Sequence, residues 1–213
     1  MMDFLRKTLS GFSAGILISI GGCVYLACDN KYVGALLFCV ALVCICYKGY
    51  SLFTGKVGYL AEKCGKEELS VLFTGLFGNV IGTYLCGLAA AYAFPAYAEK
   101  AAEMCAAKLT QTFGGTAIRA IFCGVLMYLA VSIFRDRDKV LGILLCIPVF
   151  ILSGFEHSIA DMFYFAVSGT VSWEAFGFIW TVIAGNAVGA LILPVLNGAW
   201  KKENKKARKK SKK

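Results

Sequence analysis

Hydrophobic residues gather in six long stretches along the chain, separated by short polar segments. Each stretch has about 20 residues, the length that an α-helix needs to cross ~30 Å of hydrocarbon. The pattern predicts an all-α polytopic membrane protein with six transmembrane helices, over residues 10–28, 33–54, 70–93, 112–134, 140–167 and 174–199. The first stretch is too long for a signal peptide and has no cleavage site, so no cleaved signal is expected.

The composition excludes a single soluble domain of this size. Of the 213 residues, 59% are hydrophobic, and the mean hydropathy is +0.70. The ten cysteines lie mostly inside the predicted spans and form no CxxC pair. Metal sites need clustered ligands at defined spacing, so neither a metal nor any other cofactor is predicted.

The positions of lysine and arginine predict the orientation. With six spans both termini lie on one side, and this side holds Arg6, Lys7, Lys56, Lys63, Lys66, Arg135, Arg137, Lys139 and the basic tail. The loops of the opposite side hold only Lys31, Lys100 and Lys108. Basic residues mark the cytoplasmic side. We therefore expect a multi-pass protein of the inner or plasma membrane with both termini in the cytoplasm.

The chain ends in a basic segment at residues 201–213. Basic runs attract phosphate, so a nucleic-acid contact is one interpretation. Because this segment directly follows a span, contact with anionic lipid headgroups is the simpler one. The sequence thus predicts one transmembrane domain over residues 1–200, a cytoplasmic tail that meets membrane lipids, and no nucleic-acid partner.

The string GNxxG occurs twice, at residues 78–82 and 185–189, in the third and sixth predicted spans. Small residues let helices approach closely, and the asparagines, Asn79 and Asn186, can form hydrogen bonds between helices. Three spans per half is an odd number, so the two halves must have opposite orientation. The sequence therefore predicts two inverted three-helix repeats, at about residues 8–93 and 112–199.

The second and fifth spans are interrupted near their middle. They belong to segments 32–60, interrupted at 49–55, and 139–167, interrupted at 153–158. Irregular backbone at membrane depth is tolerated only where protein buries it or where it lines a wet cavity. Because the two breaks fall at equivalent places of the repeats, we expect Thr54 and His157 to face each other across a pore.

His157 is the only histidine of the chain, and Glu156 precedes it in the same apolar stretch. Ionisable residues at this depth usually line a substrate or proton path. Imidazole titrates near pH 6.5 and can donate or accept a proton, so transport is expected to depend on pH in the range of histidine. Apolar candidates for the walls of the pore are Phe38, Leu42, Phe53 and Phe150.

These strings resemble the motifs of the formate/nitrite transporter family, which includes hydrosulfide channels. GFEHSIADMF at residues 154–163 resembles its fifth-span signature and is the most specific match. LFTG at 52–55 resembles the loop that breaks its second helix, and FSAGILISIG at 12–21 its first span. With the two GNxxG strings, the resemblance covers about residues 8–199 in order.

The resemblance implies an aquaporin-like protomer with helices 2 and 5 broken at the midplane, assembled as a homopentamer with one pore per protomer. The pore would conduct small monovalent anions with, or as, their conjugate acids. The central histidine of the family falls on His157, its partner threonine on Thr54, and its vestibule lysine on Lys108. The other predicted pathway residues are Phe38, Leu42, Leu52, Phe53, Asn79, Phe150, Glu156 and Asn186.

Lys108 would concentrate anions by its potential, although a solvated loop charge is the alternative. The sequence departs from the family in three features. The first span begins near residue 10, which leaves almost no N-terminal amphipathic helix. Gly124 stands where relatives often carry a pore-facing asparagine, and Asp161 replaces an asparagine.

Three classes of function were compared. A channel or proton-coupled transporter for formate, nitrite or hydrosulfide agrees best with these motifs. An aquaglyceroporin-like pore for neutral solutes is the alternative, but the paired Asn-Pro-Ala breaks of such pores are missing. An enzyme is not expected, because no nucleophile, metal cluster or phosphate loop accompanies His157.

Overall fold

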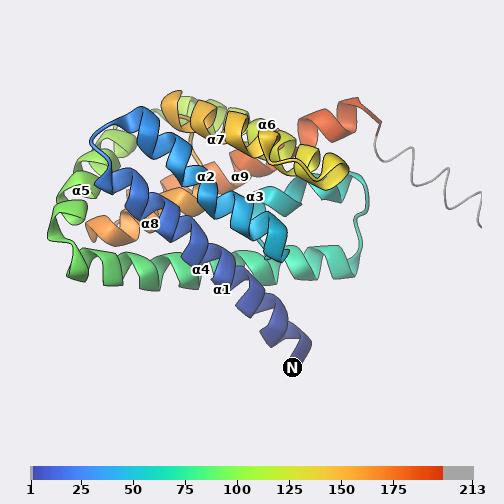
Figure 1. The fold of residues 1–213 in the computed structure, drawn as a ribbon, viewed down its shortest axis with the longest axis horizontal. Helices are drawn as coiled ribbons and strands as arrows, with labels where there is room; N and C mark the ends of the chain where they lie inside the picture. Colours follow the sequence, from blue (N-terminus) through green and yellow to red (C-terminus); the bar gives the residue numbers. More distant parts are fainter. Residues whose placement is uncertain (1, 199–213) are drawn as a thin grey trace, which may run out of the picture.

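The computed structural model describes residues 2–198, and all regular secondary structure in that range is helical (Figure 1). The basic tail at residues 201–213 lies outside the described residues. The helices are α1 (Met2–Ala27), α2 (Lys31–Lys48), α3 (Phe53–Lys56), the 3-10 helix η1 (Val57–Ala61), α4 (Lys66–Ala93), α5 (Pro95–Leu109), α6 (Phe113–Arg137), α7 (Leu141–Leu152), α8 (Ser158–Ser168) and α9 (Trp173–Leu196).

Five of these helices, α1, α2, α4, α6 and α9, are long and apolar enough to cross a membrane. The segment predicted as the fifth span consists of two shorter apolar helices, α7 and α8. Helix α1 begins at Met2, eight residues before the predicted start of the first span. In this first part of the helix the ammonium of Lys7 pairs with Asp3 at 2.6 Å and with Glu67 of α4 at 2.8 Å.

The glycines of both GNxxG strings lie where long helices meet. A Cβ at Gly78 of α4 would lie 2.2 Å from the carbonyl oxygen of Thr8 in α1. A Cβ at Gly189 of α9 would lie 2.0 Å from the carbonyl oxygen of Ile121 in α6. Real side chains do not approach so closely, so α1 packs against α4, and α6 against α9, at a distance that only glycine allows.

Gly124 belongs to the same kind of contact. A Cβ at this position would lie 2.3 Å from the carbonyl oxygen of Asn186 in α9. A side chain at position 124 of this chain would therefore point into α9. Because position 124 faces α9, Gly124 cannot be compared directly with the pore-facing asparagine that relatives often carry there.

Helix α5 was not predicted from the sequence, which placed a loop between residues 93 and 112. It begins at Pro95, whose ring is tolerated in the first helical turn. It packs against α8 at the end of the molecule shown in green at the left of Figure 1. Helix α5 places Lys108, in its last turn, over the start of α8.

Both predicted helix breaks are present. Helix α2 ends at Lys48, the following Gly49 has a left-handed backbone (φ 70°), and α3 begins at Phe53. Helix α7 ends at Leu152, Gly154 has φ 67°, and α8 begins at Ser158. Because left-handed backbone is strained for most side chains, glycine at both positions lets the chain leave the helix axis.

Candidate functional site at the two helix breaks

The asparagine of the first GNxxG string holds the first break in place. Asn79 is fully buried, and its Oδ1 accepts the backbone N–H of Phe53 at 3.0 Å. Its Nδ2 donates to the carbonyl oxygens of Ser51 at 2.9 Å and of Gly11 in α1 at 2.8 Å. One side chain thus satisfies both ends of the broken backbone and ties it to α1.

The asparagine of the second string makes the equivalent bonds at the second break. Oδ1 of Asn186 accepts the backbone N–H of Ser158 at 2.9 Å. Its Nδ2 donates to the carbonyl oxygens of Glu156 and of Ala120 in α6, both at 2.8 Å. Both asparagines, predicted as pathway residues, lie behind the breaks and bond backbone groups.

The two breaks bring Thr54 and His157 together, as expected from the sequence. Both are buried, with 1% and 2% of their surfaces exposed. His157 caps α8, because its Nδ1 accepts the backbone N–H of Ala160 at 3.1 Å. A ring nitrogen that accepts carries no hydrogen, so the hydrogen of the neutral ring is on Nε2. It points at Oγ1 of Thr54, 2.8 Å away, which leaves the threonine hydrogen free for a solute.

A second proton on this ring would have to sit on Nδ1. It would face the N–H of Ala160 and break the cap of α8. The observed hydrogen bonds therefore favour a neutral His157, whose Nε2–H acts as a donor. The polar pair carries no net charge in this arrangement.

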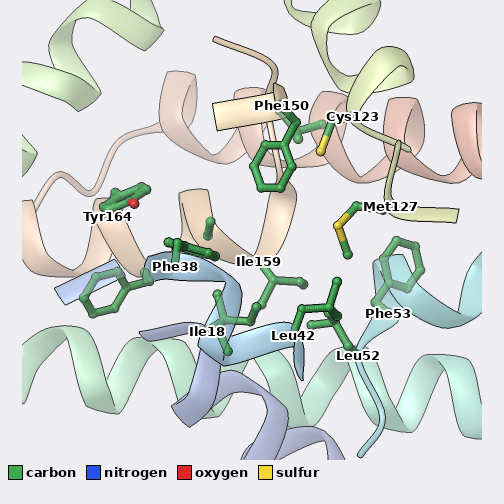
Figure 2. Packing of buried hydrophobic residues seen from close by; sticks show 14 of the residues in the cluster. Ile18, Phe38, Leu42, Leu52, Phe53, Cys123, Met127, Phe150, Ile159 and Tyr164 are labelled. Carbon is green, nitrogen blue, oxygen red and sulfur yellow. The ribbon is translucent and has the colours of Figure 1, made fainter. Parts of the chain in front are cut away.

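Apolar side chains surround the pair. The ring of Phe150 stacks on the imidazole with centroids 5.6 Å apart. Figure 2 shows Leu42, Leu52 and Phe53 near one another at the right, Phe38 to their left and Phe150 above. All five were predicted as pathway residues. The structure places them in one apolar cluster, in which Phe150 contacts His157 and Phe53 directly precedes Thr54.

A cavity of about 620 Å³, the Lys108 cavity, opens on one side of the pair. Its lining includes His157, Phe38, Phe150, Lys108, Arg119 and Asp161. Arg119 donates to the carbonyl oxygen of Gly154 at 3.1 Å and so joins the rim of the cavity to the second break. The sequence pattern does not indicate this role of Arg119, because its partner Gly154 lies 35 positions farther along the chain.

Lys108 is buried against two carboxylates, so the alternative of a solvated loop charge is wrong. Its ammonium pairs with Glu156 and, at 3.0 Å, with Asp161. The other oxygen of Glu156 accepts from Gln111 at 2.7 Å. Oδ2 of Asp161 is buried without a hydrogen-bond partner among the described residues. One ammonium is thus shared by two acidic groups, which weakens its positive potential.

A second cavity, of about 240 Å³, lies on the other side of the pair and is here named the Lys56 cavity. Leu42, Leu52 and Gly55 line it toward the break, and Lys56, Tyr59 and Arg135 line it farther out. Phe38 lines the first cavity and Leu42, one helical turn later in α2, lines the second. His157 lines the first cavity, and Leu52 and Gly55, on either side of Thr54 in the chain, line the second, so the Thr54–His157 pair lies between the two cavities.

We expect Asp161→Asn to raise the rate of anion uptake through the Lys108 cavity. The variant removes one of the two negative charges beside Lys108, and a unit charge at contact distance changes the local concentration of an anion roughly threefold to fivefold in water. The measurement is formate flux at ionic strengths of about 10 and 150 mM, because salt shortens the field from ~30 to ~8 Å. Glu103→Gln, on the exposed face of α5, is the matched control. An Asp161→Asn effect that does not vary with salt would contradict this explanation.

A buried polar pair between two cavities, inside a set of membrane-length helices, is typical of channels and transporters. Residues 1–200 match the family described as formate/nitrite transporter. The chain belongs to this family, and it is an integral, multi-pass membrane protein. The family resemblance that was read from the motifs is confirmed.

Two curated relatives cover most of the chain. An uncharacterized transporter, YrhG of Bacillus subtilis, is 32% identical over 80% of this chain and 68% of its own length. The formate channel FocA of Escherichia coli K12 is 26% identical over 91% of this chain and 76% of its own. These relatives are channels or transporters.

Solved structures share the fold. A structure described as a pentameric formate channel with formate bound matches with a TM-score of 0.77 and 25% identity, over 94% of this chain and 96% of that one. A second, described as an ion channel of the same family, matches with a TM-score of 0.72 and 21% identity, over 89% and 85%. The arrangement of helices in Figure 1 is therefore that of the family's channels.

Proposed function

We propose that this chain transports small monovalent anions of weak acids, namely formate, nitrite or hydrosulfide, each together with a proton. The observation that carries the proposal is the Thr54–His157 contact, 2.8 Å long and buried between two cavities. Because the Nε2–H of His157 donates to Thr54, the pair offers the hydroxyl hydrogen of the threonine to a solute that has lost its water.

The proton is part of the proposal because the pair is neutral and its walls are apolar. Moving a bare anion out of water is costly, and apolar walls with one free donor hydrogen offset only part of that cost. A conjugate acid carries no charge, so its transfer past Phe38, Phe150 and Leu42 is much less costly. An anion that accepts a proton in one cavity and releases it in the other avoids the barrier.

The helix arrangement proposed for this function is the six-span, aquaporin-like protomer with inverted repeats at about 8–93 and 112–199. The support is the matching set of bonds made by Asn79 and Asn186 at the two breaks. The relatives include formate channels, and no comparison favours a pore for neutral solutes such as glycerol.

We further propose a homopentamer in the inner or plasma membrane, with both termini in the cytoplasm. One related structure is described as a pentamer, and the exposed side chains of α2, α4 and α9 are largely apolar, as lipid or neighbouring protomers require. The basic residues near both termini support the orientation and a contact with lipid headgroups.

The test is flux into proteoliposomes for a panel of formate, nitrite, hydrosulfide, acetate and glycerol between pH 5 and 8. We expect saturable uptake of at least one of the three small anions, competition by the other two, and a rate that increases as the external pH falls, because the proton is a co-substrate. Liposomes without protein correct for acid that crosses the lipid. Glycerol flux without anion flux would refute the proposal.

A further inference from the structure

The two cavities differ in how their lysines are compensated. Lys108 meets two carboxylates, as described above. Lys56 also lines a cavity, but among residues 2–198 no acidic side chain pairs with it. The chain therefore presents an ammonium group without a counter-charge on the side of the pair opposite Lys108.

The other charged residue of the Lys56 cavity is also cationic. Arg135 lines the cavity and is neutralised by Glu62, which it contacts through both terminal nitrogens at 2.9 and 2.6 Å. Its guanidinium lies over the ring of Tyr59, 3.9 Å from the centroid. Lys56 and Tyr59 also line a neighbouring cavity of about 430 Å³, whose acidic residues are Glu62, Glu67 and Glu68. These three carboxylates pair with Arg135, Lys7 and Lys63, so the positive charge of Lys56 is left over.

Tyr59, which lines this cavity, carries a hydrogen-bond donor without a partner among the described residues. The hydroxyl oxygen of Tyr59 is buried, and no described residue bonds to it. Buried polar groups are normally satisfied, so such a group calls for a ligand or an ordered water. The ring of Tyr59 is fixed by Arg135 above it and by Tyr128, whose ring centroid is 5.8 Å away.

We propose that Lys56 and the hydroxyl of Tyr59 form a binding site for a small monovalent anion at the mouth of the pore. Lys56 is the last residue of α3, two positions after Thr54, so the site lies directly before the constriction. A bound anion would receive the charge of Lys56 and the hydroxyl hydrogen of Tyr59. This inference rests on the proposed function and adds the place where the anion collects on this side.

The first experiment measures the local potential without any transport. Cys46 lines the same cavity, so its rates of modification by an anionic and a cationic methanethiosulfonate reagent can be compared by mass spectrometry. The ratio of the two rates cancels changes in thiol reactivity. In Lys56→Gln we expect the ratio of the anionic rate to the cationic rate to fall about threefold to fivefold, because one unit charge is removed.

Lys48→Gln is the matched control, because Lys48 is an exposed lysine at the end of α2 and does not line the cavity. It should leave the ratio unchanged, and Lys56→Arg should keep the wild-type ratio because it keeps the charge. An equal ratio in Lys56→Gln and wild type, or no modification of Cys46 by either reagent, would overturn the proposal.

The second experiment measures formate flux from the side of Lys56, in membrane vesicles of known orientation. Lys56→Gln should lower the initial rate about threefold at 10 mM ionic strength and much less at 150 mM, because salt screens the field. Lys48→Gln should match wild type. If the wild type shows no formate flux, the proposed function is refuted. The ratio of the two thiol modification rates would still test the anion site, because it does not depend on transport.

Discussion

Replacing His157 by phenylalanine is expected to abolish substrate flux while the protein still reaches the membrane. The variant removes the Nε2–H that faces Thr54 and fills the space between the two cavities with a third apolar ring beside Phe38 and Phe150. A solute would then have to give up all its hydrogen bonds at the constriction, which costs several kcal/mol, or roughly a hundredfold or more in rate. Initial rates in proteoliposomes with matched amounts of protein provide the measurement.

The matched control is His157→Asn. Asparagine is a good N-cap residue, so it can keep the bond to the N–H of Ala160, and its amide can still donate toward Thr54. This variant should fold as wild type and retain measurable flux, and its rate should still increase as pH falls if the proton travels with the anion. Wild-type flux in His157→Phe would show that the conduction path lies elsewhere.

Replacing Asn186 by alanine is expected to destabilise the membrane domain strongly. The side chain makes three buried hydrogen bonds to backbone groups of Ser158, Glu156 and Ala120. Such bonds contribute about 1 kcal/mol each, somewhat less in membranes, and their loss leaves three backbone groups unpaired at the second break. The expected loss is roughly 2–4 kcal/mol, visible as a lower melting temperature in detergent.

Asn197→Ala is the control for this prediction, because Asn197 is an exposed asparagine at the end of the same helix. Asn79→Ala should behave like Asn186→Ala, because Asn79 makes the equivalent bonds at the first break. If Asn186→Ala and Asn197→Ala both melt at the wild-type temperature, Asn186 does not hold the second break in place.

The sequence predicted the parts of the site that depend on local pattern. The length of the hydrophobic stretches indicated the long helices. Strings that contain glycine within these stretches indicated the two helix breaks. The repeated GNxxG string gave the equivalence of the two halves, and from it the meeting of Thr54 with His157. These features could be predicted because each motif consists of about ten consecutive residues or fewer.

The features that were missed depend on contacts between distant segments. Helix α5 is too short and too polar to stand out as a span, so Lys108 was placed in a loop. Its pairing with Asp161 joins residues 53 positions apart, and no periodicity reveals it. In the same way, the ion pair of Lys7 with Glu67 joins α1 to α4, and the setting of Gly124 depends on how α6 meets α9.

The central claim is that an anion passes the neutral Thr54–His157 pair together with a proton. The direct measurement records formate uptake and internal pH at the same time in proteoliposomes whose membrane potential is clamped, with protein-free liposomes subtracted. The account predicts acidification of the interior by one proton for each formate, at a rate that does not depend on the potential. Formate uptake that follows the potential and leaves the internal pH unchanged would contradict it.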